Sequence, residues 1–117
     1  MGGAGTKIPS TKEKAGMSRY VISPEARSDL NEIWEYIAQD DFDAADSWVG
    51  KLRDAIELVA RVPGIGHTRR DLTDHSVLFW PVGAYLIIYR VRNRLVEIAA
   101  VTHGARDIPS FLRGRTQ

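Results

Sequence analysis

Arginine is the side chain of this sequence with the clearest capacity for recognition chemistry. Every Lys or Arg position from residue 53 onward is Arg. A guanidinium presents a planar fork of N–H donors that matches a carboxylate or a phosphate, which a lysine ammonium does not. We therefore take six arginines as candidates for contact with a target or partner: Arg69, Arg70, Arg90, Arg92, Arg94 and Arg106. For Arg106 the neighbouring Asp107 offers a plainer role, a local ion pair.

Two further side chains, His103 and Trp80, complete the set of candidate contact residues. His103 ends an apolar run, where it serves either as a partner contact or as a structural hydrogen-bond donor. Trp80 precedes a proline at an expected sheet edge, where core packing and partner contact are both open. The remaining histidines are interpreted as solvated loop residues and the remaining tryptophans as core residues: His67, His75, Trp34 and Trp48.

The ionisable residues divide the chain into an acidic and a basic part. Residues 25–57 contain ten acidic residues against three basic ones, whereas residues 58–117 contain nine arginines against four acidic residues. These parts carry net charges of −7 and +5, which predicts a molecule with two electrostatic faces. A plainer interpretation, in which the acids only form solvated helix surfaces, is open for residues 25–57.

A chain of 117 residues is long enough for one domain with one hydrophobic core. We expect a tail or leader over residues 1–16, the folded domain over 17–112 and a short tail over 113–117. Cysteine is absent, which excludes disulfides, thiolate metal sites and cysteine nucleophiles. No secretory signal and no apolar run of membrane-spanning length is visible, so we expect a cytoplasmic protein without a membrane partner.

Hydrophobic periodicity predicts a short strand followed by two helices. Residues 19–22 form the strand, and the Ser23-Pro24 pair supplies an N-cap and a first helical residue. Apolar residues then recur every three or four positions, first to about residues 39–41 and again from about Asp43 to a Pro-Gly pair. The short break between the two runs predicts an antiparallel helical hairpin.

The second half of the chain predicts three strands. A loop over 63–74 is rich in turn formers, and the strand at 77–82 contains Pro81, which indicates a sheet edge or a bulge there. Residues 85–107 are predicted to be two central strands that turn at residues 92–94. The order β-α-α-β-β-β indicates an α+β fold with the helical hairpin packed on one face of a small, mainly antiparallel sheet. The remainder from residue 108 is interpreted as a tail.

Four short segments, taken together and in order, are more informative than any one of them. They are YVISPEA at 20–26, VPG at 62–64 with Gly66 and Arg69 beyond it, YLIIYRV at 85–91, and VTHGARD at 101–107. In this arrangement the chain resembles the RelE/ParE superfamily of bacterial type II toxins over about residues 17–112. The last segment resembles the ParE branch in particular.

The resemblance implies two competing activities. Toxins of the RelE-like branch cleave messenger RNA on the ribosome, which needs a base, cations that hold the phosphate and an acid. That branch usually has an Arg after the first Tyr of the strand at 85–91 and often a Tyr near the C-terminus. This sequence has Leu86 and Phe111 there, and neither side chain binds phosphate or exchanges a proton. The nuclease interpretation is weaker for that reason.

We therefore predict a ParE-like toxin that is not an enzyme and has no catalytic residues, cofactor or metal. The ParE branch binds DNA gyrase, stabilises the cleaved complex and is associated with plasmid stabilisation. The resemblance implies a ParD-like antitoxin in a heterotetramer or larger assembly, gyrase as the target, and DNA as an indirect partner only. Two alternatives stay open, a RelE-like ribosome-dependent endoribonuclease and a non-toxic binding module of the same fold.

Overall fold

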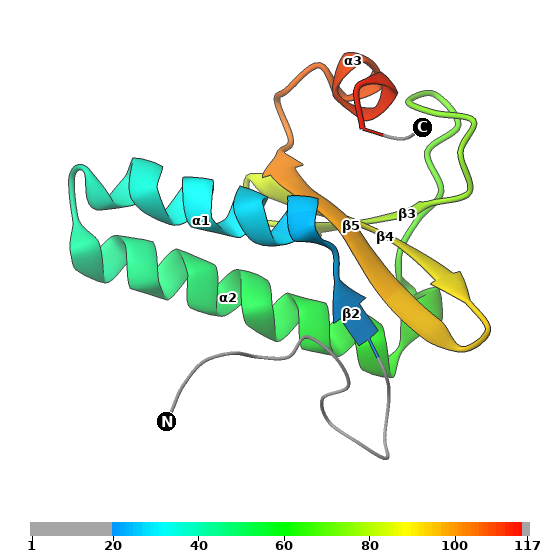
Figure 1. Cartoon of the computed structure of the whole chain (residues 1–117), viewed down its shortest axis with the longest axis horizontal. Helices are drawn as coiled ribbons and strands as arrows, with labels where there is room; N and C mark the ends of the chain where they lie inside the picture. Colours follow the sequence, from blue (N-terminus) through cyan, green and yellow to red (C-terminus); the bar gives the residue numbers. More distant parts are fainter. Residues whose placement is uncertain (1–19, 116–117) are drawn as a thin grey trace.

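The computed structural model describes residues 20–115, which form a four-stranded sheet covered by two long helices on one face and a short helix on the other (Figure 1). The elements in chain order are β2 (Tyr20–Ile22), α1 (Pro24–Ala38), α2 (Phe42–Arg61), the 3-10 turn η1 (Pro63–Ile65), β3 (Leu78–Val82), β4 (Tyr85–Arg92), β5 (Leu95–His103) and α3 (Ile108–Arg113). The expected tail over residues 1–16 lies outside the described residues, and the domain limits stay a prediction. No helix within residues 20–115 is long and apolar enough to cross a bilayer.

The helical hairpin confirms the predicted arrangement of α1 and α2, which run side by side in opposite directions (Figure 1). Ser23 caps α1, because its Oγ accepts a hydrogen bond from the Ala26 amide at 3.0 Å. Asp41 caps α2 by accepting from the Ala44 amide at 3.0 Å. Each cap accepts a hydrogen bond from a backbone N–H group that has no acceptor within its own helix. Both helices therefore begin directly after a short polar residue that can serve as an N-cap.

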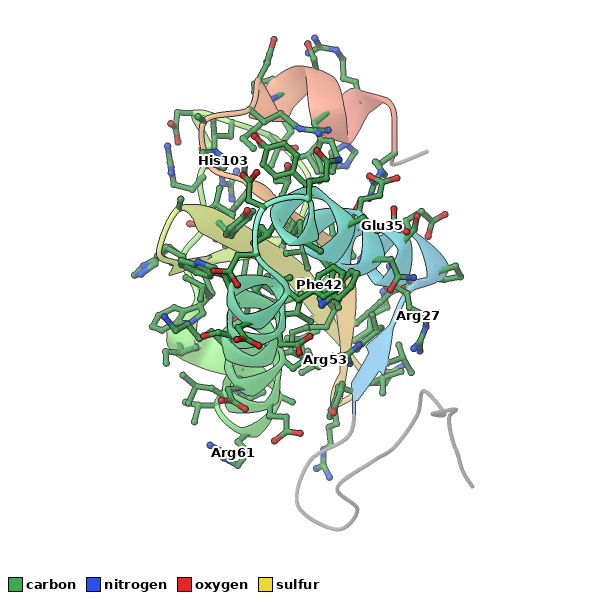
Figure 2. The ribbon with its side chains drawn as sticks, turned by 90° about the vertical axis from the view of Figure 1, so that its left-hand side faces the viewer. Arg27, Glu35, Phe42, Arg53, Arg61 and His103 are labelled. Carbon is green, nitrogen blue, oxygen red and sulfur yellow. The ribbon has the colours of Figure 1, made fainter. Side chains whose placement is uncertain are left out.

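The tryptophans of the hairpin, predicted to be core residues, pack instead at its margins. Trp34 stacks on Phe42 with ring centroids 5.7 Å apart, and its Nε1 donates to Asp46 Oδ1 at 2.8 Å. Phe42 is exposed at the end of the molecule where the two helices meet (Figure 2). Trp48 contacts the edge of the Tyr85 ring at 5.6 Å, so it joins α2 to the start of β4.

The sheet has the strand order β2-β5-β4-β3. As predicted, β4 and β5 are central and antiparallel, and they turn at Asn93 and Arg94, whose φ angles of 51° and 64° suit a tight hairpin turn. β3 is an edge strand and contains Pro81, which confirms the predicted edge. β2 is the other edge and pairs in parallel with residues 96–98. Within the described chain, no strand pairs with the outer edge of β5 over residues 99–103.

Each face of the sheet carries an apolar core. The larger core lies under the helical hairpin and consists of Ala26, Leu30, Leu52, Ile56, Val59, Ile87, Tyr89, Val96, Ile98 and Val101. The smaller core lies on the other face and consists of Val77, Phe79, Ile88, Ala100, Ile108 and Leu112. Two of its members belong to α3, so the segment interpreted as a tail from residue 108 is in fact a helix that covers this face.

The helix α3 begins after Asp107, whose Oδ1 accepts from the Ser110 amide at 3.2 Å. Its span of six residues is less than two full turns. Such a short element shows no helical period in the sequence, which explains why periodicity did not predict it.

Tyr89 fixes the start of the loop that carries Arg69 and Arg70. Its buried hydroxyl donates to the Pro63 carbonyl at 2.7 Å and accepts from the Gly66 amide at 2.9 Å. A Cβ on Gly66 would lie 2.5 Å from that hydroxyl oxygen, so the loop approaches too closely for a larger residue. Burial also raises the pKa of Tyr89.

Candidate partner-binding site

The turn end of the β4–β5 hairpin carries three of the predicted contact residues, Arg90, Arg92 and Arg94. Arg92 and Arg94 are exposed. The Arg90 Nε lies 3.2 Å from Glu97 Oε1 on β5, yet its N–H is not aligned to make a hydrogen bond. Arg90 and Arg92 also line a cavity of about 410 Å³ together with Arg115. The turn end is thus a cation-rich surface suited to anionic groups.

The loop arginines have different surroundings. Arg69 Nε and Nη2 donate to Asp71 Oδ1 and Oδ2 at 2.9 and 2.7 Å. These hydrogen bonds raise the pKa of Arg69 and lower the pKa of Asp71. Arg69 is therefore paired within its own loop, although solvent weakens the pair. Arg70 is exposed and lines a separate cavity with Asp74.

Trp80 is a packing residue in this structure. It is half-buried on β3 against the larger core, and its ring stacks on His67 with centroids 6.2 Å apart. The His67 amide donates to the Phe79 carbonyl at 2.9 Å, and the Phe79 amide donates back at 2.8 Å. His67 was interpreted from the sequence as a solvated loop residue, and it is exposed, while its backbone forms a bridge that extends the edge of the sheet beside β3.

The exit end of the hairpin, at the end of β5, holds His103 and Arg106. The His103 Nδ1 accepts from the Ala105 amide at 3.1 Å, so a neutral imidazole carries its proton on Nε2. Its ring meets Tyr85 edge-on at 5.4 Å. The Arg106 guanidinium stacks over the Phe111 ring at 4.6 Å rather than pairing with Asp107, which caps α3.

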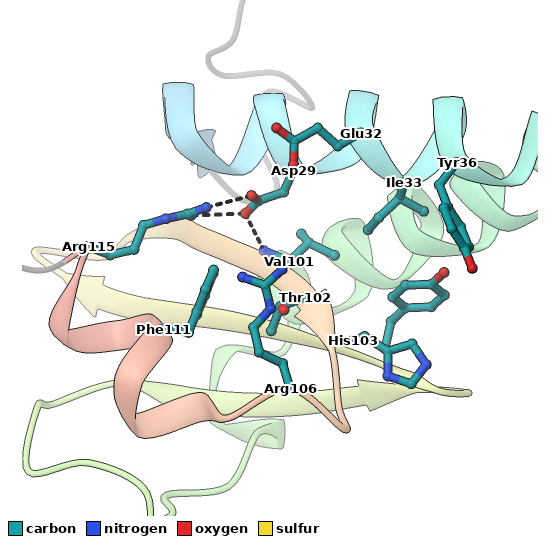
Figure 3. Close-up of a pocket in the computed structure, with 11 residues that line it drawn as sticks. Asp29, Glu32, Ile33, Tyr36, Val101, Thr102, His103, Arg106, Phe111 and Arg115 are labelled. Carbon is teal, nitrogen blue, oxygen red and sulfur yellow. Dashed lines mark hydrogen bonds and ion pairs between the residues drawn. The ribbon is translucent and has the colours of Figure 1, made fainter.

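His103 and Arg106 line a pocket of about 470 Å³, which we call the α1–β5–α3 pocket (Figure 3). Its other lining residues are Asp29, Glu32, Ile33 and Tyr36 from α1, Tyr85, Val101 and Thr102 from the sheet, and Phe111 and Arg115 from the C-terminal part. Thr102 is 4% exposed, and its Oγ1 has no hydrogen-bond partner among residues 20–115. A buried hydroxyl without a partner is uncommon and costs free energy, which makes this pocket a candidate binding site.

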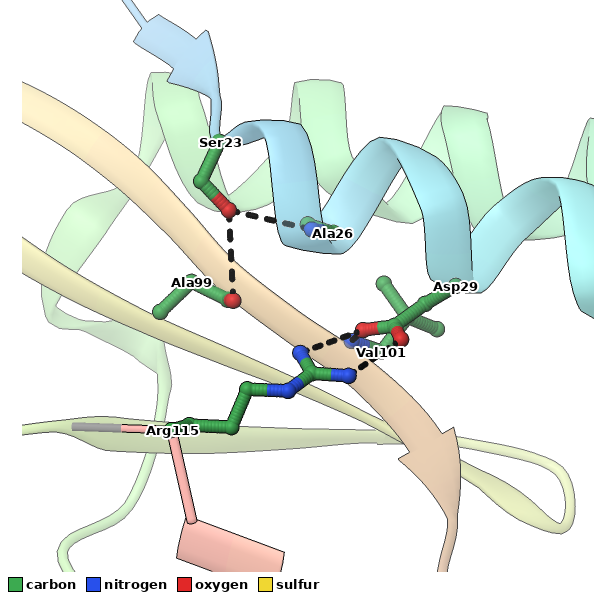
Figure 4. A network of polar contacts seen from close by, with 6 residues as sticks. All are labelled: Ser23, Ala26, Asp29, Ala99, Val101 and Arg115. Carbon is green, nitrogen blue, oxygen red and sulfur yellow. Dashed lines mark hydrogen bonds and ion pairs between the residues drawn. The ribbon is translucent and has the colours of Figure 1, made fainter.

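A partly buried ion pair forms one side of this pocket (Figure 4). Arg115 Nη1 and Nη2 donate to Asp29 Oδ2 and Oδ1 at 3.0 and 2.7 Å, and the Val101 amide donates to Oδ2 at 3.0 Å. The hydrogen bonds to Asp29 raise the pKa of Arg115. Arg115 also stacks on Phe111 at 4.4 Å. These contacts fix the chain after α3 against α1.

The predicted contact residues do not form one site. His103 and the turn arginines lie at opposite ends of β5, roughly 26 Å apart at the rise of an extended strand. Sequence reasoning missed Asp29, Thr102 and Arg115. Asp29 had a signal, because it lies three residues after the buried Ala26 and so shares the sheet side of α1. No group of three or more His, Cys, Asp or Glu side chains in the described residues is placed to hold a metal ion.

Comparison with solved structures defines the class of this fold. The chain aligns with a solved structure of the chromosomal ParDE TA system from P. aeruginosa, with a TM-score of 0.64. The alignment covers 74% of this chain and 96% of that chain at 17% sequence identity. This likeness establishes a shared fold and confirms the predicted α+β architecture.

Comparison with sequences then gives the family. The family model of the ParE toxin of the type II toxin-antitoxin system, parDE, matches residues 20–108. Toxin ParE1 of Caulobacter vibrioides is 33% identical over 97 residues, which are 82% of this chain and 99% of the relative. Toxin ParE1 of Mycobacterium tuberculosis is 28% identical over 93 residues, 78% of this chain and 94% of the relative. The chain belongs to the ParE toxin family, which confirms the ParE branch of the resemblance.

Proposed function

We propose that this ParE-like toxin binds DNA gyrase in the cytoplasm and stabilises the cleaved gyrase–DNA complex, without catalysis of its own. The observation that carries the proposal is the packing of Leu86 and Phe111. Leu86 packs against the smaller core, and the Phe111 ring lies against the guanidinium groups of Arg106 and Arg115. The ribosome-dependent nuclease branch has an Arg and a Tyr at the corresponding places, so the groups that hold phosphate and donate a proton there are replaced by apolar packing.

The test compares the two targets directly. Purified toxin is added to gyrase in a DNA supercoiling assay and, separately, to translating ribosomes with a primer-extension readout. We expect reduced supercoiling and accumulation of linear DNA, with intact messenger RNA. Messenger RNA cleaved at ribosomal A-site codons, with normal supercoiling, would instead support the nuclease alternative.

A ParD-like antitoxin is the second part of the proposal. The P. aeruginosa relative is described as a ParDE system, and the chain here offers a segment of net charge −7 over residues 25–57 and arginine-rich ends on its hairpin. A disordered antitoxin tail that folds on binding can use both kinds of surface. We expect the product of the neighbouring reading frame to copurify with the toxin as a heterotetramer or larger assembly. Light scattering after gel filtration gives the stoichiometry, and added antitoxin should restore supercoiling.

A further inference from the structure

The α1–β5–α3 pocket has one wall that can donate hydrogen bonds. Thr102 contributes a buried hydroxyl without a partner in the described residues. His103 follows Thr102 on β5, so its side chain lies on the opposite face of the sheet, against the Tyr85 ring, and it is not counted among these donors. Arg106 contributes an exposed guanidinium, whose flat face rests on Phe111 and leaves its N–H edges for an acceptor (Figure 3).

Apart from Arg115, which is paired with Asp29, the rest of the pocket is apolar or acidic. Ile33, Tyr85 and Phe111 are half-buried and provide apolar surface, and Tyr36 on α1 is 72% exposed. Glu32 lines the same pocket from α1. The pocket therefore has donors on the β5 side, a carboxylate on the α1 side and apolar surface between them.

Asp29 does not compete for the donors on the β5 side. Both of its carboxylate oxygens are bound by Arg115, and Oδ2 also accepts from the Val101 amide. Arg106 is thus left as the cation of the pocket that is available to a ligand. The stacking on Phe111 holds its guanidinium in place, which reduces the side-chain entropy lost on binding.

These features select a ligand of particular chemistry. An ionised carboxylate only accepts hydrogen bonds and has room for several donors, which matches Thr102 and Arg106. A phosphate group would bring more negative charge toward Glu32 on the facing side, so a singly charged carboxylate suits the pocket better. The volume of about 470 Å³ is within the usual range for ligand pockets and leaves space for an apolar group beside the carboxylate.

We propose that this pocket receives a segment of the antitoxin in which an Asp or Glu lies next to a large apolar residue. The carboxylate binds Arg106 and Thr102, and the apolar side chain packs on Ile33, Tyr85 and Phe111. This inference rests on the proposed neutralisation by an antitoxin and assigns it a specific anchor.

The experiment measures the affinity of the full toxin chain for the purified product of the neighbouring reading frame by calorimetry. Arg106→Gln should weaken binding about 10- to 100-fold, the usual effect of losing a charge-assisted hydrogen bond. Thr102→Val keeps the shape of the side chain and should weaken binding about fivefold. The matched control is Arg61→Gln, an exposed arginine at the end of α2, which should bind like the wild-type toxin.

A stability measurement separates recognition from folding. The Thr102 hydroxyl has no partner to lose in the free toxin, so Thr102→Val should keep or raise the unfolding midpoint while it lowers affinity. A merely structural threonine would instead lower both. Circular dichroism during urea unfolding gives the midpoint for each variant.

The outcomes distinguish the two proposals. If the wild-type toxin does not bind the neighbouring product, both the neutralisation and the anchor are overturned. If it binds, and Arg106→Gln and Thr102→Val bind within twofold of wild type, only the anchor is overturned. Substitution of the antitoxin acids to Asn or Gln, one at a time, should reveal one position whose loss is not additive with Arg106→Gln, and additive losses at every position would also overturn the anchor.

Discussion

The two ends of the β4–β5 hairpin hold their cationic side chains in different ways. At the turn end, Arg92 and Arg94 are exposed around a tight turn. At the exit end, Arg106 stacks on Phe111, and so does Arg115, which is also paired with the buried Asp29 and lies between this end and the cavity that Arg90 and Arg92 line. Side chains that are already fixed lose less entropy on binding, whereas exposed charges act mainly by long-range attraction. The difference suggests that the exit end provides specific recognition and the turn end promotes encounter.

The exit end should be the more sensitive to mutation, and Asp29→Ala should have the largest effect. This change leaves the buried Val101 amide and the Arg115 guanidinium without their acceptor. We expect the free energy of unfolding, measured by urea denaturation, to fall by about 3 kcal/mol. Arg115→Gln should cost less, because Asp29 keeps the Val101 amide. Equal losses in the two variants would contradict the role of the Asp29–Val101 hydrogen bond.

Phe111→Ala should have the next largest effect. The ring is half-buried beside the smaller core and contacts two guanidinium groups, so its loss should cost about 2 kcal/mol, less than a fully buried ring. Amide exchange of α3 should accelerate. Phe111→Leu keeps apolar packing but not the aromatic face and should recover part of the loss. Unchanged exchange in α3 after Phe111→Ala would mean that the ring does not hold this helix in place.

Charge reversal at the turn end should separate function from stability. Replacement of Arg90, Arg92 and Arg94 by Glu should change the free energy of unfolding by about 1 kcal/mol or less, because two of the three side chains are exposed and the third is only partly buried. Gyrase inhibition or antitoxin affinity should fall by about tenfold, mainly through a slower association rate at low salt.

The control for that experiment reverses the same number of charges elsewhere. Arg27, Arg53 and Arg61 lie on α1 and α2 (Figure 2), and their replacement by Glu gives the same change in net charge. If both triple variants behave alike, or if the turn variant is normal in both assays, the turn arginines have no specific role.

The smallest effect, at neutral pH, is expected for Tyr85→Phe at the exit end. Burial and the nearby Tyr36 raise the pKa of Tyr85 above its ordinary value of 10.0. The folded state then holds this proton more tightly than the unfolded state, so stability is unaffected below about pH 10 and falls as the pH rises from there toward the folded-state pKa. Tyr85→Phe removes this contribution and should lose less stability than wild type between pH 9 and pH 11 in urea titrations. Parallel curves for the two proteins would show that Tyr85 ionises alike in both states.

The fold was largely predictable because its elements have clear local signals. The apolar period of α1 and α2, the Ser23-Pro24 cap and the Pro81 edge were each visible in a few consecutive residues. α3 was missed because a helix of six residues is held by contacts with the sheet rather than by its own pattern.

The candidate site was predicted only in part. His103 and Arg106 were found from their types, and they do share a pocket. Arg69 was a candidate by the same reasoning, but its guanidinium donates two hydrogen bonds to the carboxylate of Asp71, two residues away. The pairing of Asp29 with Arg115 joins residues 86 positions apart, and no local pattern indicates such a contact.

Asp29 has one more consequence, which concerns association of the chain with copies of itself. Among the described residues, β2 pairs only with residues 96–98 of β5. Residues 99–103 of β5 therefore form an edge without a neighbouring strand. Such an edge can template a strand from another molecule and start aggregation. The Asp29 carboxylate occupies the Val101 amide, and the Ser23 hydroxyl donates to the Ala99 carbonyl at 3.3 Å. The side chains of Ser23 and Asp29 thus occupy two of the hydrogen-bonding positions that an intruding strand would use.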